Sequence, residues 1–132
     1  MQYKSEGSAP FHKVSRQVLF DLDELGCQWR YFEMAADGHT TLERHQHVHA
    51  VMILRGHGQC LVGDQVIDVA PHDLVEVPPL TWHQFRADGN APMGFLCLVR
   101  QDRDRPQLPD TQALARLRDN PAIRAFLDRK HD

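Results

Sequence analysis

Paired cysteines, long apolar runs and an excess of positive charge are all missing from this sequence. Its 132 residues include three cysteines, an odd number without zinc-ribbon or Cys-x-x-Cys spacing, so we expect a reduced, cytoplasmic protein. Lys and Arg number 15 against 18 Asp and Glu, and the net charge of −3 argues against a nucleic-acid partner. No stretch has the roughly 18–20 apolar residues of a membrane span, and the first residues lack the apolar run of a secretory signal. The length fits one domain.

Histidine is the residue that is present in excess. The sequence holds nine histidines, and His45, His47 and His49 fall within one short stretch. A fourth, His83, follows two prolines in a separate segment. We expect the other five, in predicted turns or near the chain ends, on the surface: His12, His39, His57, His72 and His131.

The middle of the chain alternates short apolar segments with turn residues. Gly, Pro, Asn and Asp separate these segments, a pattern typical of an antiparallel sandwich or barrel. The fold class is therefore predicted to be all-β. The predicted strands cover 17–20, 28–34, 41–45, 49–54, 59–62, 65–69, 74–77, 82–87 and 94–99.

Two regions flank this barrel, which we place at residues 17–100. Residues 1–16 are polar and are predicted to form an N-terminal arm. Residues 101–132 are predicted to be a charged linker followed by two short helices, since Asp110 and Asn120 are each suited to cap a helix. The second helix carries an apolar stripe that we expect to cover the barrel or a partner subunit: Ile123, Phe126 and Leu127.

Strand geometry decides which histidines can converge. The residues after His49 alternate as in a strand with one apolar face, so we expect its imidazole to face the core. Glu43 and His45 share a face for the same reason. Along one straight strand His45 and His49 would lie about 13 Å apart, too far for both to reach a metal ion at about 2.1 Å. We therefore predict a turn at residues 46–48, with His47 at its tip.

The residues around this turn resemble the first motif of the cupin superfamily. That motif places a His-x-His pair and then a glutamate between two glycines, which here are Gly38 and Gly56. Glu43-x-His45 falls on the His-x-His pair, and His49 falls on the glutamate position. The ligand types of the family are thus kept, with Glu and His exchanged.

The second cupin motif falls on the segment that contains His83. The histidine of that motif matches His83, whereas His72, Leu80 and Ala87 stand where the family has Gly, Gly and Asn. The resemblance implies an antiparallel, jelly-roll-like cupin barrel with a divalent transition metal (Fe, Mn, Ni, Cu or Zn) at one mouth. The metal ligands that it implies are Glu43, His45, His49 and His83.

A second register remains open. It takes His45-x-His47 as the His-x-His pair and makes His47 the alternative to Glu43. The residue of the two that does not bind metal is a candidate general base.

The resemblance implies an enzyme acting on a small molecule, either a metal-dependent oxygenase or a related lyase or isomerase. The alternative is a non-enzymatic barrel that binds or senses a metal or small ligand. Because the segment 49–54 is apolar on both faces, we also predict a homodimer. Four residues are predicted to form the apolar wall of the site: Ile53, Phe85, Phe95 and Cys97.

Overall fold

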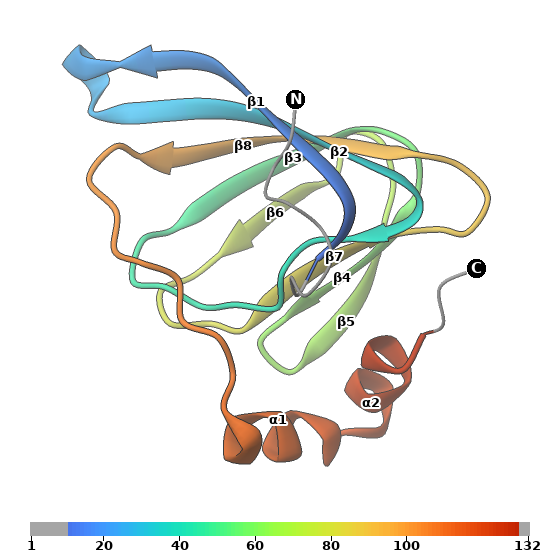
Figure 1. The fold of residues 1–132 in the computed structure, drawn as a ribbon. Coiled ribbons are helices and arrows are strands. Elements are labelled where there is room, and N and C mark those ends of the chain that lie inside the picture. Colours follow the sequence, from blue (N-terminus) through green and yellow to red (C-terminus); the bar gives the residue numbers. More distant parts are fainter. Residues whose placement is uncertain (1–10, 130–132) are drawn as a thin grey trace.

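Strands make up most of the structure, and two short helices follow them (Figure 1). The computed structural model describes residues 11–129. A 3-10 turn at Asp23–Leu25 joins the first two strands. The strands are β1 (His12–Leu22), β2 (Cys27–His39), β3 (His49–Arg55), β4 (Gly58–Val62), β5 (Gln65–Val69), β6 (Leu74–Val77), β7 (His83–Ala87) and β8 (Met93–Arg100), and the helices are α1 (Thr111–Arg118) and α2 (Pro121–Leu127).

The strands form one curled antiparallel sheet that closes halfway into a barrel (Figure 1). Neighbouring strands follow the order β5-β4-β7-β2-β8-β3-β6, and β1 pairs with β2 beside this path. β2 is long enough to serve several partners: most of it pairs with β1 and β8, and its last residue, His39, pairs with Arg86 of β7. The predicted all-β antiparallel barrel with a C-terminal helical tail is confirmed.

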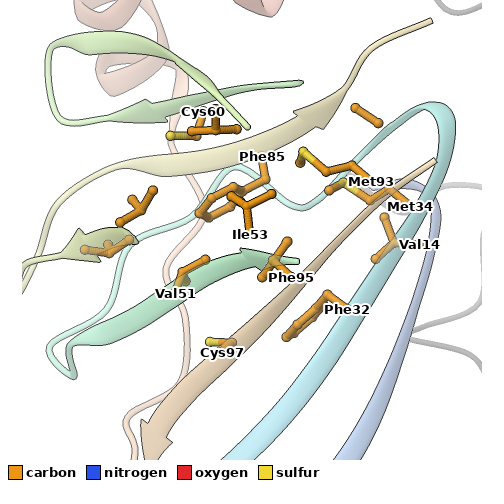
Figure 2. Packing of buried hydrophobic residues seen from close by; sticks show 14 of the residues in the cluster. Val14, Phe32, Met34, Val51, Ile53, Cys60, Phe85, Met93, Phe95 and Cys97 are labelled. Carbon is orange, nitrogen blue, oxygen red and sulfur yellow. The ribbon is translucent and has the colours of Figure 1, made fainter. Parts of the chain in front are cut away.

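The inner surface of the sheet is apolar over much of its length (Figure 2). Alternate residues of β2 point inward, so Phe32 and Met34 are buried beside Arg30. Phe95 of β8 stacks on Phe32 at 5.0 Å and on Phe85 of β7 at 4.6 Å between ring centroids. These three aromatic rings lie beside the polar residues of the barrel interior.

The start of the first strand and the segment 41–45 differ from the sequence-based expectation. The first strand begins at His12 rather than within 17–20. The reason is that Val14, predicted as part of the arm, is buried in the core and pairs with β2. Residues 1–10 of the predicted arm lie outside the described residues. The segment 41–45 is not a strand and makes only isolated bridges, at Glu43 and Arg44.

The two helices pack on the outside of the sheet. The Asp110 carboxylate accepts from the Ala113 N–H at 2.7 Å, and the Asn120 side chain accepts from the Ala122 N–H at 2.9 Å, so both predicted caps are present. The apolar stripe of α2 covers the barrel, one of the two expected partners. It completes a second buried cluster of Leu42, Leu61, Leu117, Ile123 and Phe126.

The outer face of β3, β6 and β8 is also apolar. A shallow groove there is lined by residues that include Met52, Leu74 and Leu96, and the Leu74 side chain is 74% exposed. This is the face on which the sequence predicts a homodimer, which stays a prediction. All three cysteines carry free thiols. Within residues 11–129, neither helix has the length and apolar character needed to cross a membrane.

Candidate metal centre

Three histidines from separate parts of the chain meet on the inner side of the sheet. His45 lies in the loop before β3, His49 is the first residue of β3, and His83 is the first residue of β7. The nitrogens that they offer as ligands all lie within 4.8 Å of one another. The His45 ring centroid is 4.4 Å from that of His49 and 4.7 Å from that of His83. Imidazoles at these distances can share one small cation.

The loop between His45 and His49 bends where the spacing predicted a turn, at residues 46–47. The His45 carbonyl accepts from the Leu80 N–H at 2.7 Å, and the Gln46 N–H donates to the Asp104 carboxylate at 2.9 Å. The loop is thus held from two sides. It brings together two imidazoles that a straight strand would keep apart.

Hydrogen bonds fix which nitrogen of the His45 ring and of the His83 ring faces the centre. His45 Nδ1 lies 2.7 Å from the His47 carbonyl oxygen, and His83 Nδ1 lies 2.9 Å from the Thr81 carbonyl oxygen. A carbonyl only accepts, so each Nδ1 carries the proton and each Nε2 carries a lone pair. Such outer contacts orient a histidine for metal binding.

His47 belongs to the same cluster and is not an exposed turn tip. Its side chain is buried, its ring stacks on His45 at 3.7 Å between centroids, and its Nδ1 donates to Asp104 Oδ1 at 2.9 Å. The Nε2 atoms of His47 and His49 are 3.2 Å apart. Two nitrogens bound to one ion at about 2.1 Å and angles between 90° and 109° would be about 3.0–3.4 Å apart. The geometry is therefore compatible with His47 as a ligand.

Glu43 lies directly opposite His83 in an isolated antiparallel bridge. The Glu43 N–H donates to the His83 carbonyl at 3.2 Å, and the His83 N–H donates to the Glu43 carbonyl at 3.0 Å. Directly opposed residues of an antiparallel pair present their side chains on the same face. Glu43 is 7% exposed and lines the same cavity as His83, but the side chains whose ligand atoms lie within 4.8 Å of one another are those of His45, His49 and His83.

Burial keeps these imidazoles neutral. Desolvation lowers the pKa of His83 to about 4 and also lowers the pKa of His49 and of His45. Desolvation lowers the pKa of His47 against the opposing effect of Asp104. The pKa of the Asp104 carboxyl is itself lowered to about 2, first by the Gln46 N–H and then by His47. A neutral imidazole has the lone pair that a metal ion requires.

The cluster opens into a cavity of about 250 Å³. Of the predicted apolar wall, Phe85 and Phe95 line the cavity, whereas Ile53 and Cys97 are fully buried behind it. Cys97 Sγ nevertheless lies 3.6 Å from His49 Nδ1. Phe32 completes the aromatic side.

Four charged residues of the site were not predicted. Asp104 comes from the charged segment after β8, which the sequence presented only as a linker. Arg16, Arg30 and Arg103 also line the cavity. Only Arg30 left a signal in the sequence, since it shares the inward face of β2 with apolar residues.

The remaining histidines lie apart from this cluster. His57 and His72 are exposed, as expected. His39 is buried, and its Nδ1 lies 2.9 Å from the Thr40 carbonyl oxygen, so the surface expectation was wrong there. The reason is that β2 continues through His39 instead of ending in a turn. His131 lies outside the described residues.

Known proteins resemble this chain along nearly its whole length. A protein of Rhodospirillum rubrum named 1-methylthio-D-xylulose 5-phosphate methylsulfurylase is 56% identical over 128 residues, which cover 97% of this chain and 82% of that protein. A crystal structure of a cupin-2 domain from Rhodospirillum rubrum matches with a TM-score of 0.93 and 55% identity over 97% of this chain and 86% of that one. A cupin 2 conserved barrel domain protein from Rhodopseudomonas palustris matches with a TM-score of 0.92 and 59% identity over 96% and 87% of the two chains.

The family follows from these comparisons. Residues 30–99, more than half of the chain, match the Cupin domain family. The match includes both regions that resemble the cupin motifs. It does not include the first strand or the two helices. This chain belongs to the cupin family.

Proposed function

We propose that this chain is a metal-dependent cupin enzyme that removes the methylsulfanyl group from a phosphorylated methylthio-ketopentose. The observation that carries the proposal is the convergence of His45, His49 and His83 at a cavity lined by aromatic and cationic side chains. The reaction class comes from the name of the 56% identical relative. The oxygenase activity expected from the sequence is not confirmed, because that name describes a different type of enzyme.

The residues present fit a divalent transition metal. His45 Nε2 is buried and has no hydrogen-bond partner among the described residues. A buried polar atom left without a partner is costly, and a cation at the centre of the cluster would satisfy it. A histidine-dominated set suits Fe, Mn, Ni, Cu or Zn. We propose His45, His49 and His83 as ligands of such an ion.

Glu43 and His47 compete for the fourth ligand position. The separation of His47 Nε2 from His49 Nε2 supports His47, and the bridge between Glu43 and His83 supports Glu43. Glu43→Ala and His47→Ala, made separately, distinguish the two possibilities. The variant that lacks the true ligand should bind severalfold less metal, whereas the other variant should keep its metal content. The residue that does not bind metal remains beside the substrate as a general acid or base.

The chemistry follows from the compound in the relative's name. In a 1-methylthio-2-ketose, the carbon that carries sulfur is next to a carbonyl carbon. If the methylsulfanyl group passes to a thiol, a sulfur–sulfur bond forms, the C1–S bond breaks with its electron pair left on C1, and the thiol proton is released. His45, His49 and His83 would hold a divalent ion, which would supply Lewis acidity for the negative charge that develops on this part of the substrate.

The chain's own residues supply the rest of the environment. Phe32, Phe85 and Phe95 form an apolar side that excludes water and strengthens electrostatic contacts in the cavity. C1 must regain a proton after the sulfur leaves. We propose that Glu43 or His47, whichever is not a ligand, accepts the proton released by the thiol and transfers it to C1.

The test uses the full chain purified without a histidine tag. The protein is incubated with 1-methylthio-D-xylulose 5-phosphate and a small thiol, and mass spectrometry follows the sugar phosphate and the mixed methyl disulfide. We expect both the 1-deoxy sugar phosphate and the disulfide to form, and His83→Ala to abolish the reaction. The exposed His57→Ala is the matched control and should keep full activity. Bound metal without turnover would instead support the non-enzymatic binding barrel.

A further inference from the structure

An arginine is buried in the core-facing row of β2. Arg30 is 6% exposed, and its Nε has no hydrogen-bond partner among the described residues. Its Nη2 lies 3.6 Å from Cys97 Sγ, and its guanidinium carbon lies 5.1 Å from the Phe32 ring centroid. No carboxylate within residues 11–129 forms an ion pair with it. A largely buried charge without a counter-ion is unfavourable, so the fold retains Arg30 at the expense of stability.

Two further arginines line the same cavity. Arg16 of β1 lies directly opposite Phe32, and Arg30 is two residues before Phe32 on β2, so all three side chains leave the same face of this pair of strands. Arg103 arrives from the segment after β8, where its Nη1 donates to the Arg100 carbonyl at 2.7 Å. Burial lowers the pKa of Arg103, and the nearby charges of Arg30 and Arg16 lower it further. The three guanidinium groups are therefore close enough to repel one another.

The lining of this cavity holds more arginines than acids. Its lining includes two carboxylates, Glu43 and Asp104. Asp104 is already engaged by the His47 ring and by the Gln46 N–H. Glu43 sits at the His83 side of the cavity, through its bridge to that residue.

We propose that Arg16, Arg30 and Arg103 form the subsite for the phosphate group of a phosphorylated substrate whose other end reaches the histidine cluster. Guanidinium groups bind phosphate through paired, charge-assisted hydrogen bonds, and a phosphate dianion removes the mutual repulsion of three cations. The identity of the other end rests on the proposed function, whereas the phosphate subsite rests on these arginines alone.

The arginine end and the histidine end are close enough for one small molecule to contact both. Arg30 Nη2 and His49 Nδ1 are each 3.6 Å from the same Cys97 sulfur, so these two nitrogens are no farther apart than twice that distance. In a 2-ketopentose 5-phosphate, about five bonds of roughly 1.5 Å separate the carbonyl carbon from phosphorus, about 6 Å when extended. One molecule can therefore place its carbonyl at the histidines and its phosphate at the arginines.

The first test measures binding of inorganic phosphate to the purified full chain by isothermal titration calorimetry. Arg103→Gln and Arg16→Gln, at partly exposed positions, should each weaken phosphate binding by about tenfold or more. Arg124→Gln, on the exposed face of α2, is the control and should bind as the wild type does. Equal phosphate affinity in Arg103→Gln, Arg16→Gln and the wild type would overturn the proposal.

A second test uses Arg30→Met, for which a phosphate-binding role and a purely structural role predict different results. Arg30→Met removes the buried cation and should abolish phosphate binding while the Tm stays the same or rises, because no ion pair is lost. A large fall in Tm with phosphate affinity retained would show a structural role and overturn the assignment. If Arg30→Met does not fold, the phosphate affinities of Arg103→Gln and Arg16→Gln decide whether the subsite exists.

A third measurement separates a bound substrate phosphate from free phosphate. D-xylulose 5-phosphate should bind at least about tenfold more tightly than D-xylulose to the wild type, and this preference should disappear in Arg103→Gln. If the preference is lost but no methylsulfanyl transfer occurs, the subsite stands and the proposed reaction fails. If transfer occurs with an unchanged KM for the phosphorylated substrate in all three arginine variants, the reaction stands and the subsite fails.

Discussion

Acid should destabilise the metal-free protein through its buried histidines. His83 is 4% exposed, and burial lowers its pKa to about 4, below the value near 6.5 of an unfolded histidine. Between these two pH values the unfolded chain binds more protons than the folded chain. The free energy of unfolding must therefore fall as pH falls from about 6.5 to about 4, and it should be flat above about pH 7.5.

The magnitude follows from the two pKa values. His83 alone should lower the free energy of unfolding by about 2 kcal/mol between about pH 8 and pH 5, and by about 3 kcal/mol at about pH 4. The lowered pKa values of His45, His47 and His49 act in the same direction. The loss from His83 is a large fraction of the stability of a typical domain.

The assay is urea unfolding of EDTA-treated protein at several pH values from about 8 to about 4.5, followed by tryptophan fluorescence. His83→Gln cannot titrate in this range, so it should lose about 2 kcal/mol of the pH dependence, whereas His57→Ala should keep all of it. A flat free energy of unfolding down to about pH 5 would refute the reasoning. So would an unchanged pH dependence in His83→Gln.

Four further outcomes are expected. Phe126→Ala should lower the free energy of unfolding by about 3–4 kcal/mol, because it empties the cluster under α2; urea unfolding measures this, and a loss under about 1 kcal/mol would contradict the packing. Asp110→Ala should cost about 1 kcal/mol through the lost cap of α1, and no measurable cost would contradict the cap. A thiol reagent should label one cysteine, Cys27, in the native protein and three after denaturation, since burial raises the pKa of the Cys60 thiol to about 12. Light scattering should give the mass of a dimer for the wild type and of a monomer for Leu74→Glu; a wild-type monomer would contradict the predicted homodimer.

Short-range patterns in the sequence were enough to predict most of the fold. Turn residues at regular intervals marked β3 to β8, and the capping residues Asp110 and Asn120 marked both helices. The length of β1 was not predictable in this way. Its early residues are held by pairing with β2 and by burial of Val14, which are contacts between distant parts of the chain.

The candidate site was predictable only where the spacing itself constrains geometry. Because His45 and His49 cannot share an ion along a straight strand, the bend between them could be inferred. The burial of His47 could not, since it depends on Asp104 returning from the far end of β8. The convergence of Arg16 and Arg103 likewise arises from the curvature of the sheet and the path of the chain after it. No local sequence pattern predicts the curvature of the sheet or the path of the chain after it.

Metal content is the most direct test of the central claim, that the histidine cluster is a metal centre. Protein purified without a histidine tag or nickel column should contain about one divalent transition metal ion per chain by elemental analysis. His83→Ala should lower this severalfold, and the exposed His57→Ala should not change it. Metal content that is unchanged in His83→Ala, or equally reduced in His57→Ala, would contradict the account.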